Sequence, residues 1–147
     1  MEDRLEQSVT INAGLDRVWD LVSQPGWWVP STLESAVDRT VGHRTVRESA
    51  RWGRFVVEVV SVDPPGYAAF RWASEFPGDD PVPGKATLVE FFVKEVGEAV
   101  EVTVVESGFA ALQLPAERRA SARKDNTNGW QEELAELTAR AERAPAG

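Results

Sequence analysis

Residues 115–143 show the apolar spacing of one long helix whose two halves differ. The second half carries an apolar stripe at helical period, made of Trp130, Leu134, Leu137 and Ala141. Residues 117–128 continue the same face without any large apolar side chain. A helix that packs on a sheet by this face would close the core at one end and leave it under-filled at the other. The pattern therefore predicts a binding cavity beside the first half of the helix.

The N-terminal part of the chain has the patterns of one strand and two short helical pieces. Apolar and polar residues alternate over 5–11, which is the period of a half-buried strand. Apolar residues over 15–22 then share one helical face, and Pro25-Gly26 ends that helix. The apolar stretch 27–30 is too short to be an independent element. We expect it to form a short helical plug that caps the core, and a contact with ligand is the alternative.

The middle of the chain has the pattern of successive strands joined by short turns. Residues 77–84 are predicted to form a loop because they include three prolines and two glycines. Short connections favour antiparallel pairing, and helices kept apart from the strands indicate an α+β fold. With the N-terminal strand we expect about six to seven strands. Those predicted in this region are 36–40, 44–51, 54–62, 67–74, 87–96 and 100–107.

The length and charge of the chain limit its structure and its partners. A chain of 147 residues is expected to form a single domain, 1–147, that buries roughly 68–70% of its unfolded surface. Lys and Arg total 16 against 24 Asp and Glu, which gives a formal net charge of −8. An acidic chain without a basic block is not expected to bind nucleic acid.

Missing residue types and motifs narrow the chemistry further. The sequence has no cysteine, which excludes disulfides and thiolate catalysis. It shows no phosphate-binding or dinucleotide motif and no spaced metal ligands, so we expect neither a cofactor nor a metal. The polar start Met1–Asp3 is unlike a signal peptide, and no apolar run approaches the ~18 residues of a membrane span. We expect a cytoplasmic protein, monomeric or homodimeric.

Three motifs occur in order along the chain: VTINA at 9–13 followed by Val18-Trp19, ESGF at 106–109, and NGW at 128–130. Together they resemble the START-like or Bet v 1-like superfamily, also called SRPBCC, and most of all its branch named for the activator of Hsp90 ATPase. The resemblance implies a helix-grip fold. In that fold a curved antiparallel sheet wraps the long C-terminal helix, and a cavity lies between them.

Glu106 is the polar residue with the most specific prediction. Its alternation with Val102 and Val104 places its side chain on the helix-facing side of the sheet. A carboxylate there loses hydration, which raises its pKa unless a cation or hydrogen-bond donors compensate. Arg123, on the under-filled helix face, is the expected partner. Glu106 would then bind a polar ligand group or act as a general base. The alternatives are a structural Glu–Arg pair, or a carboxylate near the strand end that reaches water.

The other candidates are aromatic side chains and polar residues of the last helix. His43, the only histidine, lies at a predicted turn and is expected at the surface. A solvated helix face that can form an i, i+4 ion pair is expected from Glu132, Glu133 and Glu136 with Arg140 and Arg143. Gly129 costs a helix about 1 kcal/mol relative to Ala, which favours a close approach of the helix backbone, and Trp130 is expected in the core. The candidate ligand-binding residues are Trp28, Trp52, Phe55, Phe70, Trp72, Phe91, Val104, Glu106, Arg123, Asn126 and Thr127.

Two non-catalytic functions are consistent with these features. The first is binding of a small apolar or amphipathic molecule between helix and sheet, favoured by six tryptophans and the lack of a recognisable catalytic set. The opposite wall of that cavity would be formed by 89–93 and 102–106. The second is a protein-interaction domain similar to the Hsp90 activator, with an exposed Trp27-Trp28 pair as its anchor. We expect the first of these.

An enzyme is the remaining alternative. The superfamily includes polyketide cyclases and hydrolases, and the resemblance implies that such chemistry is compatible with the fold. Glu106 or His43 would then act as the base in a dry pocket. Arg123 or Asn126 would hold the developing oxyanion.

Overall fold

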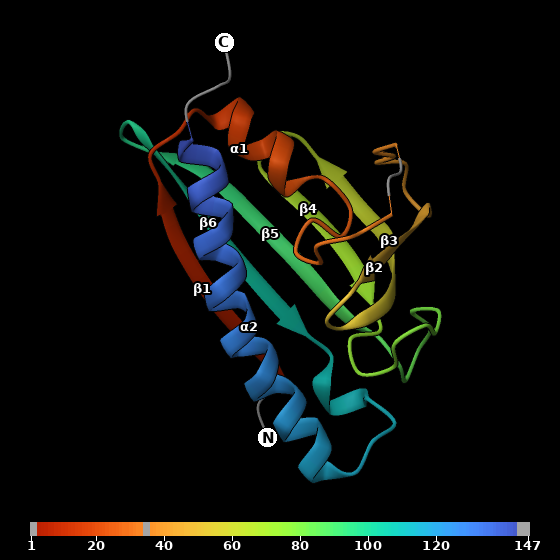
Figure 1. Ribbon diagram of the computed structural model, residues 1–147. Helices are drawn as coiled ribbons and strands as arrows, with labels where there is room; N and C mark the ends of the chain where they lie inside the picture. Colours follow the sequence, from red (N-terminus) through yellow and green to blue (C-terminus); the bar gives the residue numbers. More distant parts are fainter. Residues whose placement is uncertain (1–2, 34–35, 144–147) are drawn as a thin grey trace.

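The computed structural model describes residues 3–33 and 36–143, and it has the predicted α+β helix-grip architecture (Figure 1). Its strands are β1 (Arg4–Ile11), β2 (Arg44–Ser49), β3 (Gly53–Asp63), β4 (Tyr67–Trp72), β5 (Thr87–Val96) and β6 (Ala99–Ser107). Its helices are α1 (Leu15–Val22), the 3-10 helix η1 (Phe109–Ala111) and α2 (Ala116–Glu142).

The strands form one antiparallel sheet in the order β1-β6-β5-β4-β3-β2. Strands β2 to β6 each pair with their neighbour in sequence because short connections join most of them, and β1 completes the far edge by pairing with β6. The long helix α2 crosses the concave face of this curved sheet (Figure 1). Arg17 of α1 donates hydrogen bonds to main-chain carbonyls of Arg140 and Ala141, so α1 is tied to the last turns of α2.

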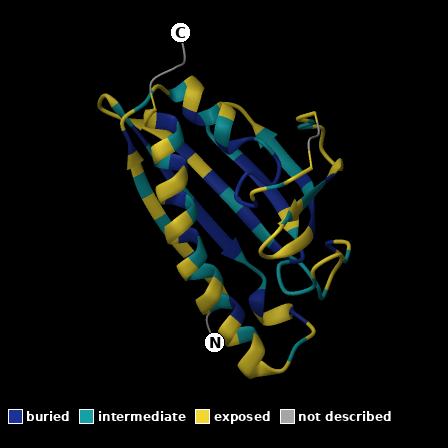
Figure 2. Cartoon of the chain, in the orientation of Figure 1, coloured by how far each residue is buried: buried dark blue, intermediate teal, exposed yellow. Residues whose placement is uncertain are grey.

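The inner face of the sheet follows the period-2 pattern of its strands. In β5, Val89, Phe91 and Val93 are buried, whereas Phe92 and Lys94 between and beyond them are exposed. Figure 2 shows the same contrast across the molecule, with buried segments behind α2 and exposed positions on its outer side. The predicted strands 87–96 and 100–107 are therefore confirmed, the second with one additional residue at its start.

The second short helix predicted after the first strand is wrong. Residues 24–29 form successive turns instead of a helix, because Pro25 is followed by Gly26 in a left-handed conformation with φ of +75°. The predicted capping role is confirmed, since Trp27 and Trp28 are only 5% and 4% exposed. An exposed Trp27-Trp28 anchor for a protein partner is therefore contradicted.

The strand predicted at 36–40 is also wrong. Residues 36–40 have no regular structure. Val37 is half exposed, and the guanidinium of Arg39 bonds to Ser23 and Asp20 near the end of α1. Side-chain bonds to α1 replace strand pairing in this segment. His43 lies at the surface, as predicted, where its Nδ1 is 3.5 Å from an oxygen of Asp38.

The helix α2 confirms the predicted span and its apolar stripe. Trp130, Leu134, Leu137 and Ala141 are all buried. In the first half, Ala122 is also buried, and η1, which contacts α2, lies beside the start of α2 in Figure 1. That space is therefore partly filled by η1. Within the described residues, no helix is both long and apolar enough to cross a membrane.

Candidate functional site

Glu106 lies on the inner face of the sheet, as its alternation with Val102 and Val104 predicts. It has no exposed surface. Its Oε1 accepts hydrogen bonds from Trp130 Nε1 at 2.8 Å and from Asn126 Nδ2 at 3.1 Å. Its Oε2 accepts from Thr87 Oγ1 at 2.5 Å, from Trp72 Nε1 at 2.9 Å and again from Asn126 at 3.1 Å. The donors come from β4, β5 and two turns of α2, so one carboxyl group links β6 to three other elements.

The environment of Glu106 acts on its pKa in two opposing directions. Burial disfavours the charged form and raises the pKa of this carboxyl above its usual value. The hydrogen bonds from Thr87, Trp130, Trp72 and Asn126 stabilise the carboxylate and oppose that rise. All of these donors are neutral groups. The carboxyl is therefore held by directed hydrogen bonds instead of by a neighbouring cation.

Arg123 does not supply the expected partner of Glu106. Its Nε donates instead to the main-chain carbonyl of Arg4 in β1, at 2.8 Å. Positions 123 and 126 are roughly 60° apart around the helix axis. This rotation aims Arg123 toward the edge strand, while Asn126 faces Glu106. Thr127 also belongs to the β1 side, because its carbonyl accepts a bond from Gln7.

A cleft of about 240 Å³ lies beside the Glu106 cluster, between α2, the 27–29 turn and the ends of β3 and β4. We call it the indole cleft. It is lined by Trp28, Val29, Trp52, Phe55, Trp72, Ser74, Glu75, Asp125, Asn126, Gly129, Trp130, Glu132 and Glu133.

Three of the residues that hold Glu106 also form the wall of the indole cleft. They are Trp72, Asn126 and Trp130. Their N–H groups are directed to the carboxyl oxygens, and Glu106 itself is not part of the lining. The indole rings therefore present carbon surface to the cleft. Asn126 is also bonded to Ser74, another wall residue, at 3.2 Å, which further fixes its amide.

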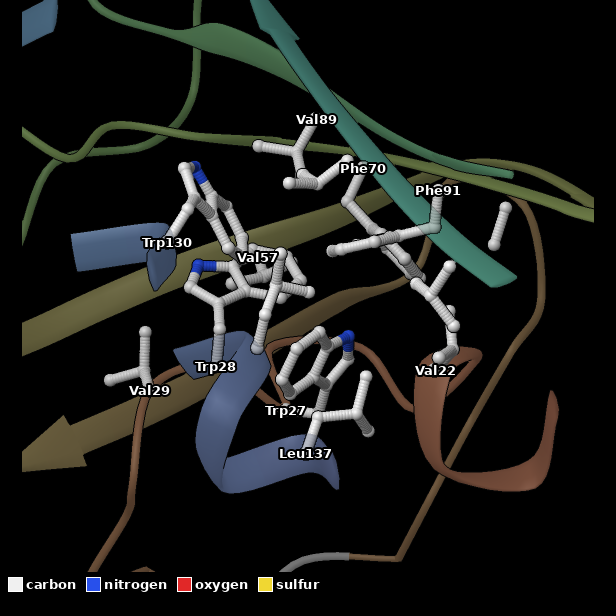
Figure 3. Close-up of a cluster of buried hydrophobic side chains, with 14 of the residues drawn as sticks. Val22, Trp27, Trp28, Val29, Val57, Phe70, Val89, Phe91, Trp130 and Leu137 are labelled. Carbon is white, nitrogen blue, oxygen red and sulfur yellow. The ribbon is translucent and has the colours of Figure 1, made fainter. Parts of the chain in front are cut away.

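Aromatic rings fill the interior next to the cleft. Figure 3 shows Trp27, Trp28, Phe70, Phe91 and Trp130 gathered between helix and sheet. Trp28 lies 5.6 Å from Phe91 and 5.5 Å from Trp130 between ring centroids. Because these rings occupy the space opposite 89–93, the predicted cavity wall there is part of the packed core. The open space lies instead at the junction of the two halves of α2.

Gly129 lines the indole cleft and does not mark a close helix–sheet approach. A Cβ placed on Gly129 would meet no heavy atom within 4 Å, so the predicted close approach of its backbone is wrong. Glycine in a helix interior costs about 1 kcal/mol relative to alanine. No packing neighbour accounts for that cost. The absent side chain leaves open space at the cleft wall.

The rim of the cleft is acidic. Glu132 and Glu133 belong to the lining, so the interpretation of 132–136 as only a solvated helix face is wrong in part. Burial first, and then the charges of Glu132 and Glu136, raise the pKa of Glu133 to about 7, against an opposing effect of Arg140. Burial likewise raises the pKa of Glu75. Carboxyl groups at this rim are thus held where their charges are poorly compensated.

The structure brings together only part of the predicted ligand-binding set. Trp28, Trp52, Phe55, Trp72 and Asn126 line the cleft, and Glu106 lies behind its wall. The predicted contacts Phe70, Phe91 and Val104 are fully buried core residues.

Some lining residues were missed by the sequence analysis, although their spacing carried a signal. Asp125, Gly129, Glu132 and Glu133 recur at helical intervals of three and four, so they share one face of α2. Val29, Ser74 and Glu75 had no such signal, because turns and loops place them. Trp130 is in the core, as predicted, and one side of it also reaches the cleft.

A larger hollow of about 510 Å³ lies on the opposite face of the sheet. Its lining comes mainly from outward-facing side chains of β1, β5 and β6, such as Glu6, Lys94 and Thr103. Phe92 is the only aromatic residue among its described lining residues, and it is 43% exposed. Alternating charged and polar side chains are ordinary for the solvent face of a sheet. The indole cleft is therefore the better candidate site.

Comparisons with solved structures agree with the fold. Protein MLL2253 from Mesorhizobium loti is 19% identical with a TM-score of 0.72, and the match covers 97% of this chain and 99% of that chain. The Aha1 dimer from Colwellia psychrerythraea is 14% identical with a TM-score of 0.68, over 99% of this chain and 100% of that one. At these identities the likeness shows the fold alone. The expected place in the Hsp90-activator branch stays a prediction.

A third similar structure is that of a protein from a biosynthetic locus. DynU16, a protein of the dynemicin biosynthetic locus, is 25% identical with a TM-score of 0.68. The match covers 95% of this chain and 47% of that chain, so this chain spans about half the length of DynU16. No curated protein matches the sequence.

The family comparison extends over nearly the whole sequence. A family model described as polyketide cyclase / dehydrase and lipid transport matches residues 2–142. The predicted START-like superfamily is thereby confirmed, and the matched span contains all the helices and strands of the structure. The chain belongs to the polyketide cyclase/dehydrase and lipid transport family of the START-like superfamily.

Proposed function

We propose that the protein binds a small, largely apolar molecule in the indole cleft and does not transform it. Five aromatic side chains contribute to the lining: Trp28, Trp52, Phe55, Trp72 and Trp130. A lining of this kind with a few fixed polar groups is typical of small-molecule sites. The cleft volume of about 240 Å³ is below the roughly 300–1,000 Å³ of sites for drug-sized ligands, so the ligand is small or is enclosed only in part.

The position of Gly129 in the cleft lining is the observation that carries this proposal. A glycine in the middle of α2 lowers helix stability, and no neighbouring atom requires the missing side chain. Its position in the cleft lining supplies a reason, because any larger residue would occupy ligand space. Space for a ligand in the cleft is therefore the best explanation for a glycine at this position.

The surroundings of Glu106 favour binding over catalysis. Its oxygens accept five hydrogen bonds, from Thr87, Trp72, Trp130 and Asn126 twice. A carboxylate offers about four lone-pair positions. No acceptor position remains free for a substrate proton unless one of these donors moves away. We infer that Glu106 orients the cleft walls and does not act as a general base.

The test compares ligand binding in two variants of adjacent helix positions. Gly129→Leu places a side chain in the cleft, whereas Asn128→Leu places the same side chain on the exposed side of α2. The ligand probe is 1-naphthaleneacetamide, followed through the indole N–H signals of Trp72 and Trp130 in NMR spectra. The wild-type protein and Asn128→Leu should bind the probe saturably, and Gly129→Leu should bind it at least tenfold more weakly.

Two results would contradict the proposal. One is equal binding by the wild-type protein and Gly129→Leu, which would place the probe elsewhere. The other is the absence of saturable binding of this probe and of its amine and carboxylate analogues to the wild-type protein. Circular dichroism of each variant checks that α2 is retained.

A further inference from the structure

The indole cleft has an uneven distribution of charge. Its acidic residues are Glu75, Asp125, Glu132 and Glu133, contributed by the segment after β4 and by two turns of α2. Among the described lining residues there is no Lys, Arg or His. Arg118 and Arg140 lower the pKa values of Glu75 and Glu133 from positions outside the lining. A cleft with low-dielectric walls and charges of one sign concentrates its field on whatever enters it.

The aromatic walls add to this negative potential. The face of an indole ring attracts cations through its quadrupole. Trp72 and Trp130 donate their N–H groups to Glu106, and a hydrogen bond to a carboxylate polarises the donor ring toward greater electron density on its face. Trp52 already receives a cation, because the guanidinium carbon of Arg51 lies 4.3 Å from its ring centroid. The aromatic and acidic parts of the cleft therefore both favour a positively charged ligand.

The arrangement of the acids argues against a metal ion. Within the described residues, no group of three or more His, Asp or Glu side chains is close enough together to hold a metal. A metal site also needs converging oxygen ligands at short distances, whereas about half of this lining is aromatic or aliphatic carbon. An organic cation differs from a metal because it satisfies separated carboxylates and apolar rings at once.

We propose that the ligand of the indole cleft is an organic cation, a protonated amine carried on a small apolar body. This inference rests on the proposed function, because it names the class of ligand for the same cleft. The apolar body contacts the rings of Trp28, Trp72 and Trp130. The ammonium group lies toward Glu132 and Glu133 at the rim. Glu133 is the acid whose charge a bound cation would relieve most directly, since burial and its acidic neighbours raise its pKa.

The test uses three naphthalene probes that differ mainly in charge: 2-(1-naphthyl)ethylamine, 1-naphthaleneacetamide and 1-naphthaleneacetate. Isothermal titration calorimetry at pH 8 keeps the amine charged and the rim acids ionised. The cation should bind the wild-type protein about tenfold more tightly than the amide, which corresponds to cation–π and carboxylate contacts together. The carboxylate should bind more weakly than the amide.

Two double variants separate local charge from overall charge. Glu132→Gln with Glu133→Gln removes both rim charges and should weaken binding of the amine about fivefold or more, while binding of the amide changes less than twofold. Glu98→Gln with Glu117→Gln removes the same charge from positions outside the cleft lining and should leave the preference for the amine unchanged.

Each outcome decides between the two proposals. Equal binding of all three probes, or tighter binding of the carboxylate, overturns the preference for a cation and leaves the proposed apolar binding function in place. Preference for the amine that persists in the rim variant also overturns this inference, because the charge would then act from elsewhere. Failure of all three probes to bind overturns both proposals.

Discussion

The indole N–H of Trp130 donates to Glu106 Oε1 at 2.8 Å, and this bond joins the middle of α2 to the last strand of the sheet. Trp130 is 3% exposed and Glu106 is fully buried, so neither group can replace this bond with one to water. The same indole is part of the cleft wall. The bond therefore sets both the position of the helix and the surface that a ligand meets.

Replacing Trp130 by Phe removes a hydrogen-bond donor to Glu106 as well as part of the ring. It should therefore destabilise the fold more than a Trp→Phe change that removes only part of a ring. We expect Trp130→Phe to reduce the free energy of unfolding by about 1–3 kcal/mol more than Trp27→Phe. Trp27 is the matched control because it is equally buried, and its Nε1 has no hydrogen-bond acceptor among the described residues. Urea denaturation of both variants measures the difference.

The same pair of variants gives a pH dependence with a defined sign. Removing a donor to the carboxylate raises the native pKa of Glu106 further above its unfolded value. When the native pKa is above the unfolded pKa, stability decreases as pH rises from the unfolded pKa to the native pKa. In this window the unfolded state ionises readily, whereas the native state ionises a carboxyl whose charge it disfavours. The free energy of unfolding that Trp130→Phe loses beyond the loss in Trp27→Phe should be larger at pH 8 than at pH 5. Equal losses at both pH values would show that Glu106 does not remain coupled to this indole.

Gly129→Ala should stabilise the protein and weaken its binding of ligand. Alanine restores about 1 kcal/mol of helix propensity, and its Cβ meets no atom within 4 Å. Because that Cβ stands at the cleft wall, it reduces the space for the naphthalene probes. Gly129→Ala should therefore raise the melting temperature in thermal unfolding and lower the affinity for the probes in titration.

The exposed neighbour Asn128 provides the control for this trade-off. Asn128→Ala also raises helix propensity, and it should stabilise the protein without changing probe affinity. Improved probe binding by Gly129→Ala would contradict the assignment of Gly129 to ligand space.

Glu133 should make the protein less stable as pH rises from about 4.5 to about 7. Its pKa is raised from the usual 4.5 of a glutamate to about 7 in the folded protein, first by burial and then by Glu132 and Glu136. The native state therefore holds more protons than the unfolded state in this window. The contribution of Glu133 to stability is complete below the unfolded pKa and is lost as pH passes the folded pKa.

Glu133→Gln removes this titration, so its melting temperature should decline less between pH 4.5 and 7.5 than that of the wild-type protein. Thermal denaturation monitored by circular dichroism over this range is the measurement. Glu98→Gln, at the turn between β5 and β6, should follow the wild-type profile. Parallel profiles for Glu133→Gln and the wild-type protein would show that Glu133 titrates as an exposed acid.

The sequence by itself determined the order of the elements and the direction of Glu106. Strands such as 87–96 and the helix 116–142 follow from periods of two and 3.6 residues, which depend only on local backbone geometry. Alternation with Val102 and Val104 likewise placed Glu106 on the inner face. The helix at 27–30 and the strand at 36–40 were wrong because short segments take their structure from what they pack against.

Only the tertiary structure decided which groups meet Glu106 and where the cleft opens. Trp72, Thr87, Asn126 and Trp130 reach its oxygens from separate elements, and their convergence depends on strand register and on the rotation of α2. That rotation directs Asn126 inward and turns Arg123 to the carbonyl of Arg4. The 27–29 turn fills the space opposite β5 and leaves an opening beside Gly129, because the packing of bulky rings is settled by all the elements together.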